Sequence, residues 1–149
     1  GSLALVLETA AKHAAAGRLA QARKSHEDAC RMAEQPNSSA DPLERSCAVL
    51  SYVTWVLKDG TWPLLLGKAP DELLLGALET ARSAKPRSKA LEGQLLFARS
   101  KALFAKPGKD AACLDAAVEA RCEAAAVLRE ASVEALPWSA QQVRLALER

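Results

Sequence analysis

Apolar side chains recur at helical spacing over most of this 149-residue chain, and short polar segments separate the helical stretches. Leu3, Leu7 and Ala10 stand three or four positions apart, which places them on one face of a helix. A second stripe of the same period follows Gly17, and glycine favours the left-handed backbone that ends a helix. The pattern therefore predicts two antiparallel helices joined by a tight turn.

The same periodicity predicts more helices along the chain, and most of them begin at a recognisable start signal. Asp41 followed by Pro42 and Glu44 is typical of a helix N-terminus. Ser88 and Ser139 are expected caps of later helices. The predicted hairpins cover about 3–36, 41–84 and 88–135, and a terminal helix covers 139–149. The sequence thus predicts an all-α chain of about seven helices, stacked as antiparallel hairpins.

Two of the predicted helices are apolar on more than one face. Residues 47–57 (CAVLSYVTWVL) are apolar nearly all round, which is typical of a helix buried on several sides. In helix 89–105, Leu91 and Leu95 share one face while Phe97 and Phe104 share another, so we expect cover on two sides. The buried stripe of the last long helix is expected at Cys113, Ala117, Ala120, Ala124, Leu128, Ala131 and Ala135.

One run near the N-terminus resembles a known helical repeat. Gly17-Arg18-Leu19-Ala20-Gln21-Ala22, followed by Ala29 and by Pro36, is similar to a tetratricopeptide (TPR) repeat, which has Gly at the turn and Ala in its second helix. His13 and His26 stand where that family has aromatic residues. The resemblance implies an α-solenoid fragment that acts as a protein-interaction scaffold.

The spacing of the hairpins leaves a second architecture open. Their predicted starts lie about 38 and about 47 residues apart, longer than the TPR period of about 34. A compact helical bundle is the alternative to a TPR-like stack.

Composition agrees with a helical protein and gives no sign of a membrane span. Hydrophobic residues make up 50% of the chain but aromatics only 4%, and the net charge is +2. Such a small net charge carries no global nucleic-acid signal. No apolar run reaches the roughly 18 residues of a transmembrane helix, so no membrane association is expected. The leading Gly1-Ser2 is typical of a cloning scar.

The four cysteines, Cys30, Cys47, Cys113 and Cys122, form no C-x-x-C pair. Each lies within a helical pattern, which favours buried thiols in a reducing compartment over disulfides. An intracellular location, cytoplasmic or nuclear, is therefore expected.

The strongest candidate for a partner contact is the apolar segment Gly60–Lys68 (GTWPLLLGK). Pro63 fits the first turn of a short additional helix. The segment either folds back to cap the core or projects as a patch of the kind that marks partner surfaces. The expected apolar anchors are Trp62, Leu64, Leu65 and Leu66.

Residues 82–109 form a basic segment in which Glu92 is the single acid. The charges would be explained by a solvated helix face whose basic residues complement the acidic residues of the next helix. The alternative is a basic surface for an acidic peptide or a nucleic acid. Arg87, Lys89 and Arg99 are the electrostatic candidates.

The sequence offers little for catalysis. His13 and His26, with Cys30 one turn beyond, form a conceivable zinc site, but no fourth ligand is near in sequence and packing between facing helices is the favoured explanation. The Gly-Lys at 67–68 lacks the spacing of a P-loop. No nucleophile–base pair stands out. We therefore expect a non-enzymatic chain with no cofactor and no metal.

These observations favour a non-catalytic scaffold domain that binds a peptide or a helix of another protein. The alternative is a nucleic-acid-binding helical domain that uses residues 82–109. TPR domains that bind chaperone C-termini use Lys and Asn in their groove, and Asn37 is the single asparagine and lies in a predicted loop. That role is therefore not expected.

Overall fold

The computed structural model describes residues 2–36 and 38–131, and this part of the chain is helical. Its helices are α1 (Ser2–Ala15), α2 (Leu19–Ala33), α3 (Pro42–Asp59), α4 (Pro70–Arg82), α5 (Lys89–Ala105) and α6 (Ala111–Glu130). The prediction of an all-α architecture is confirmed for these residues, which contain no strand beyond an isolated bridge between Leu65 and Lys68. The predicted helix 139–149 lies outside them.

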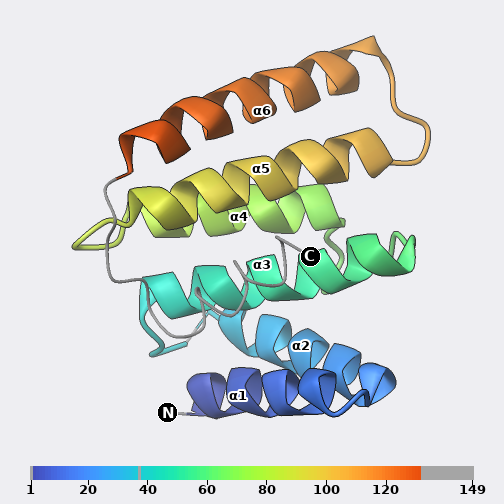
Figure 1. Cartoon of the computed structure of the whole chain (residues 1–149), viewed down its shortest axis with the longest axis vertical. Helices are drawn as coiled ribbons and strands as arrows, with labels where there is room; N and C mark the ends of the chain where they lie inside the picture. Colours follow the sequence, from blue (N-terminus) through green and yellow to red (C-terminus); the bar gives the residue numbers. More distant parts are fainter. Residues whose placement is uncertain (1, 37, 132–149) are drawn as a thin grey trace.

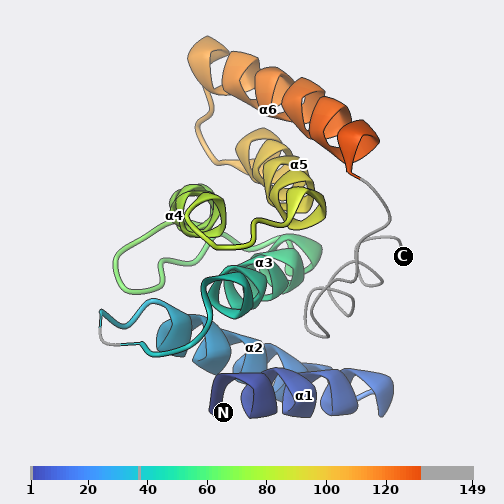
Figure 2. The same cartoon turned by 90° about the vertical axis from the view of Figure 1, so that its left-hand side faces the viewer.

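The six helices form three antiparallel pairs stacked in order (Figure 1). In Figure 1 the turns within the pairs lie along the right-hand side of the stack, and the connections between pairs lie along its left-hand side. Figure 2 shows the pairs α1–α2, α3–α4 and α5–α6 as successive layers. Helix α3 contacts α1, α2, α4 and α5, so the middle pair is covered on both sides.

Helix ends follow the start and stop signals of the sequence. Side-chain caps satisfy backbone N–H groups at three helix starts: Asp41 accepts from Leu43 (2.7 Å), Ser88 from Leu91 (3.2 Å) and Asp110 from Cys113 (2.8 Å). Gly17 has φ 80° in the α1–α2 turn, as the tight turn requires. The predicted bounds of helix 89–105 are those of α5.

The core lies on α3, as its apolar composition predicts. Cys47, Leu50 and Val53 are fully buried, and Leu73 and Leu95 meet them from α4 and α5. Each fully buried leucine stabilises the fold by about 2 kcal/mol relative to an exposed one. The two-sided cover expected for helix 89–105 is confirmed, because α5 packs against α3, α4 and α6.

A glycine sets how closely α5 and α6 approach each other. A Cβ built on Gly93 of α5 would lie 2.6 Å from Leu128 Cγ and Cδ2 on α6. Nonbonded carbon atoms pack at about 3.5–4.0 Å, so a larger residue at this position requires the Leu128 side chain to move or the two helices to separate. The present position of Leu128 in the third pair therefore favours glycine at residue 93.

Three local expectations need correction. No helix forms around Pro63: residues 61–64 have no regular secondary structure, and the bridge between Leu65 and Lys68 closes a turn directly after them. The expectation of buried thiols fails for Cys122, which is exposed on α6, and Cys113 is only half-buried. Leu128, placed in the buried stripe of α6, is 40% exposed, although its side chain lies against Gly93 of α5.

Candidate partner-binding surface

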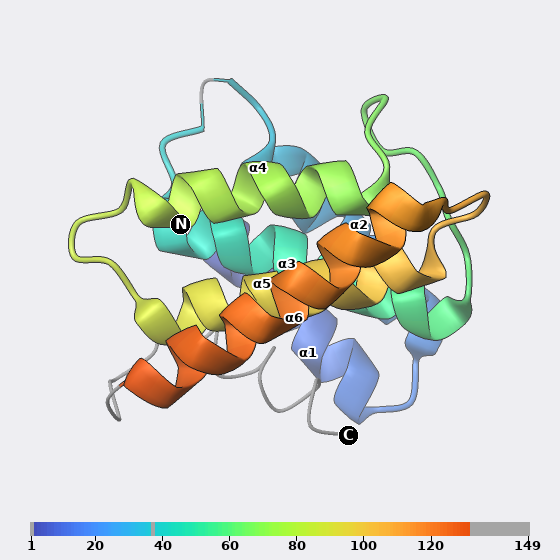
Figure 3. The same ribbon diagram turned by 90° about the horizontal axis from the view of Figure 1, so that it is seen from above.

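The connection between α3 and α4 is the most unusual segment on the surface. Gly60 ends α3 in the left-handed conformation, with φ 70°. Leu65 and Lys68 then exchange two backbone hydrogen bonds, of 2.9 and 3.0 Å. Between them, Leu66 and Gly67 both have positive φ, 53° and 77°, as a two-residue type I′ turn requires. In Figure 3 this connection, drawn in green, projects beyond the helices.

The structure divides the four expected apolar anchors between the core and the surface. Leu65 is 2% exposed and lies in the core, and half-buried Trp62 packs against that core. Leu64 and Leu66 are 68% and 59% exposed. The segment therefore folds back through Trp62 and Leu65 while it presents Leu64 and Leu66 to solvent. The buried Leu65 side chain is not available to a partner.

Leu66 is costly to the folded chain for two reasons. A non-glycine residue with left-handed φ carries roughly 1–2 kcal/mol of steric strain, and type I′ turns favour Asn, Asp or Gly at this position. The leucine recovers little of this cost by burial, because most of its side chain is exposed. Nothing in the packing of the described residues explains a leucine here.

Ion pairs fix both ends of the connection. Arg23 of α2 pairs with Asp59 at 2.9 Å and donates to Thr61 Oγ1 at 3.5 Å. Lys68 pairs with Glu34, the C-cap of α2, at 3.3 Å. The turn that carries Leu64 and Leu66 is therefore held against α2 at either end.

The three electrostatic candidates lie apart from this turn. Lys89 is the first residue of α5 and Arg87 lies two residues before it. This start of α5 is on the side of the stack opposite to the α3–α4 connection (Figure 1). Arg99 lies midway along α5 and is half-buried. The structure does not bring the predicted apolar and basic residues into one site.

Much of the basic segment is paired within the fold. Arg87 donates to both carboxylate oxygens of Glu92, at 3.0 and 2.6 Å, and Glu92 is only 3% exposed. This pairing raises the pKa of Arg87. Arg82 also reaches Glu92, at 3.9 Å, and pairs with Glu123 of α6 at 3.2 Å. Of these contacts, only the Arg82–Glu123 pair joins the basic segment to the acidic helix α6, because Glu92 belongs to α5 itself.

Two other cations of that segment have partners as well. Lys106 pairs with Asp71 at 3.3 Å, and this contact raises the pKa of Lys106. The Lys101 ammonium lies 4.7 Å from the Phe97 ring centroid, and Arg121 of α6 lies 5.6 Å from the same ring.

The histidines have structural partners. His26 is buried, is hydrogen-bonded through Nδ1 to Ser51 and stacks on Trp55 at 5.6 Å between ring centroids. Burial lowers the pKa of His26 to about 4, so it is neutral at pH 7. His13 accepts a hydrogen bond from Arg18. Within residues 2–36 and 38–131, no group of three metal-ligating side chains is placed to hold an ion.

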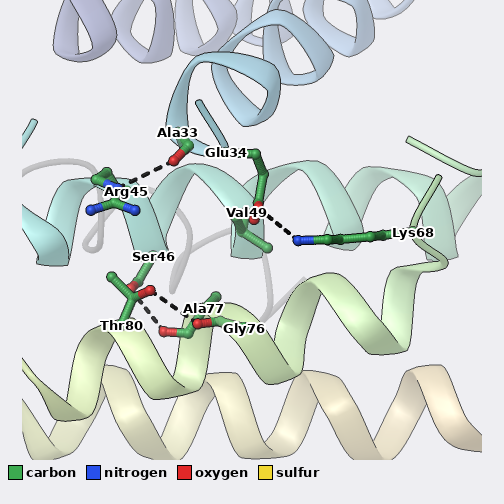
Figure 4. Close-up of a pocket in the computed structure, with 9 residues that line it drawn as sticks. All are labelled: Ala33, Glu34, Arg45, Ser46, Val49, Lys68, Gly76, Ala77 and Thr80. Atoms are coloured by element: carbon green, nitrogen blue, oxygen red, sulfur yellow. Dashed lines mark hydrogen bonds and ion pairs between the residues drawn. The ribbon is translucent and has the colours of Figure 1, made fainter. Parts of the chain in front are cut away.

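A second candidate site is a pocket of about 220 Å³ between α2 and α4, with α3 as its floor (Figure 4). No pattern in the sequence predicts a role for Arg45 or Gly76, which line this pocket. The available signal was Gly76 itself, a glycine inside a strongly helical run. Its walls are Ala33, Glu34, Arg45, Ser46, Val49, Lys68, Gly76, Ala77 and Thr80.

Comparisons with known proteins leave the family open. The sequence matches no protein-family model, and neither a curated protein nor a solved structure gives a match. Among the helices of the described part, none combines the length and the apolar character needed to cross a membrane.

Proposed function

We propose that this chain is a non-catalytic protein-interaction domain that binds a peptide or a helix of a partner protein. Leu64 and Leu66 are its apolar anchors. The observation that carries the proposal is Leu66, a mostly exposed leucine in a backbone conformation that leucine disfavours. A residue that costs folding stability without packing in return is typical of functional surfaces.

The arrangement of the helices supports a binding role. Three antiparallel pairs in series resemble TPR repeats, and stacked hairpins present extended surfaces to partner segments. Trp62 and Leu65 hold the turn in place, so that little conformational entropy is lost when a partner covers Leu64 and Leu66. The proposal includes an intracellular location, which suits cysteines that form no disulfide in the described residues.

The nucleic-acid alternative, through residues 82–109, has less support. Arg82, Arg87 and Lys106 are engaged by carboxylates of the chain itself. Phosphate binding would have to compete with these pairs. Lys89 and Arg99 have no ionic partner among the described residues, and they remain the cations to test for an acidic partner or RNA.

The proposal is tested with peptides selected from a random phage-displayed library against the wild-type chain. Selected peptides are titrated against the double variant Leu64→Ser/Leu66→Ser by fluorescence anisotropy. Each leucine covered by a ligand contributes about 1.5–3 kcal/mol, so we expect at least about a tenfold loss of affinity.

The matched control is Leu5→Ser/Leu19→Ser, which removes two leucines of comparable exposure from the first helical pair. This control should bind the selected peptides as the wild type does. Thermal unfolding confirms that both double variants are folded. Equal binding by the Leu64/Leu66 variant would show that these leucines are not the anchors.

A further inference from the structure

The pocket between α2 and α4 contains an arginine that the fold uses only in part. Arg45 of α3 donates through Nε to the carbonyl of Ala33 at the end of α2, at 3.2 Å. In the part of the chain that the structure describes, its two Nη nitrogens have no acceptor within hydrogen-bond distance. Guanidinium groups bind carboxylates through two such donors, so Arg45 retains the geometry for an anion.

The other polar groups of the pocket leave it cationic on balance. Lys68 reaches in from the α3–α4 connection and pairs with Glu34, which offsets one positive charge (Figure 4). The hydroxyls of Ser46 and Thr80 donate to backbone carbonyls, Ala77 or Pro42 for Ser46 and Gly76 for Thr80. The charge of Arg45 is thus left without a carboxylate among these residues.

Gly76 opens one wall of this pocket although the fold does not need it. It lies in the interior of α4, where glycine is less favourable than alanine. A Cβ at Gly76 would meet no atom within 4 Å, so no neighbouring side chain requires its absence. The absence of a side chain at Gly76 leaves open space beside Ala77 and Thr80 in the pocket.

The volume of the pocket limits what it can hold. Pockets for cofactors and drug-sized ligands have about 300–1,000 Å³. The roughly 220 Å³ here suit one amino-acid side chain or chain end. Val49, Ala33 and Ala77 would contact its methylene groups, and Arg45 its charged end.

We infer that this pocket binds a peptide carboxylate, either an acidic side chain or a C-terminal carboxylate, with Arg45 as its ion-pair partner and Gly76 as the opening that admits it. The inference rests on the proposed function, since the carboxylate belongs to the partner segment. Lys68 lines the pocket and also closes the turn that carries Leu66, so the pocket and the turn share a residue.

The test uses small probes that are independent of any partner. ¹⁵N-labelled protein is titrated with N-acetyl-glutamate amide, N-acetyl-leucine and the neutral N-acetyl-glutamine amide, and amide shifts are followed by NMR. We expect saturable shifts at Ser46, Gly76 and Thr80 with one or both carboxylates. The arm that binds tighter tells whether a side chain or a chain end is preferred. Equal shifts with the neutral amide would overturn the inference.

Two variants test the roles of the lining residues. Gly76→Ala should weaken the carboxylate by at least about fivefold while it raises the melting temperature, because a methyl enters the pocket and improves the helix. Arg45→Gln should weaken it by about tenfold. Leu75→Ala and Arg31→Gln, outside the pocket on α4 and α2, are the matched controls and should bind as the wild type does.

Unchanged affinity in the folded Gly76→Ala protein would also overturn the inference. The probes are too small to span from the pocket to the tip of the turn, so a negative result rejects the pocket alone. The leucine anchors are judged separately, by the selected peptides.

Discussion

The second and third helical pairs each contain a glycine inside a helix, and the two glycines have opposite relations to their surroundings. Gly93 of α5 lies under Leu128, where a Cβ would be 2.6 Å from that side chain. Gly76 of α4 faces open space in a pocket. One glycine is explained by packing within the chain, and the other is not.

The same difference extends to neighbouring residues. In the third pair, the buried Glu92 is matched by Arg87 and Arg82. In the second pair, Leu66 is strained and exposed, and Arg45 keeps donors without acceptors among the described residues. We place the binding surface on the second pair because Leu66, Arg45 and Gly76 all lie there, and packing within the described residues explains none of the three in full.

The largest effect is expected where packing leaves no room. Gly93→Leu should lower the free energy of unfolding by up to about 3 kcal/mol, because its side chain would have to displace Leu128. Urea denaturation followed by circular dichroism measures the change. Gly76→Ala is the matched control in α4 and should raise the stability by about 0.5–1 kcal/mol.

A double-variant cycle identifies the cause. In a Leu128→Ala background the contact with Gly93 is gone, so Gly93→Ala should become stabilising by the helix propensity of alanine. If Gly93→Ala were equally stabilising with Leu128 intact, the close approach of α5 and α6 would not constrain this position.

The helical architecture could be predicted because its signals are local. The caps at Asp41, Ser88 and Asp110 and the turn at Gly17 depend on residues that are neighbours in sequence. The exposure of Leu128 could not be predicted in this way. It depends on the angle at which α6 crosses α5, and a single helical stripe does not determine that angle.

The first and second pairs meet at His26, and pH tests how well that contact is packed. Burial lowers the pKa of folded His26 to about 4, whereas histidine in the unfolded chain titrates near 6.5. The unfolded state therefore takes up a proton first as the pH falls. The neutral, buried His26 contributes about 3 kcal/mol to the free energy of unfolding above pH 6.5. This contribution is lost as the pH falls from about 6.5 to about 4.

Stability curves of the wild type and of His26→Gln from pH 4 to pH 8 isolate this contribution, since carboxylate titrations are common to both. The wild type should lose more stability on acidification than the variant. His13→Gln leaves His26 in place and should follow the wild type. Parallel curves for His26→Gln and the wild type would mean that His26 is not buried neutral.

Arg87 tests whether a predicted binding residue serves the fold instead. Arg87→Gln leaves the buried Glu92 with only the longer contact to Arg82, so the melting temperature should fall clearly. Lys89→Gln, on the exposed side of the same helix, should stay within about 0.5 kcal/mol of the wild type. Similar melting temperatures for the two variants would show that Arg87 is not needed for stability, and Arg87 would again be a candidate binding residue.

The candidate site was only half predictable for a related reason. The run Leu64-Leu65-Leu66 indicates an apolar contact, but only the backbone turn decides that Leu65 points inward and its neighbours outward. The pocket brings together α2, α3, α4 and the Lys68 end of the connection. Its residues are far apart in sequence, so no local pattern predicts that they line one pocket.

The smallest effect concerns Leu66 itself and has an unusual sign. Leu66→Asn should raise the free energy of unfolding by about 0.5–1 kcal/mol, because asparagine tolerates the left-handed φ of 53° that leucine resists. Leu64→Asn is the control, since Leu64 is equally apolar and exposed but has no positive φ, and it should change stability by less than about 0.5 kcal/mol.

Both variants should bind selected peptides more weakly than the wild type. If Leu66→Asn is more stable than the wild type but binds peptides more weakly, Leu66 serves binding and not the stability of the fold. A destabilised Leu66→Asn protein would instead show that the leucine contributes to packing, and the contrast between the second and third pairs would lose its main support.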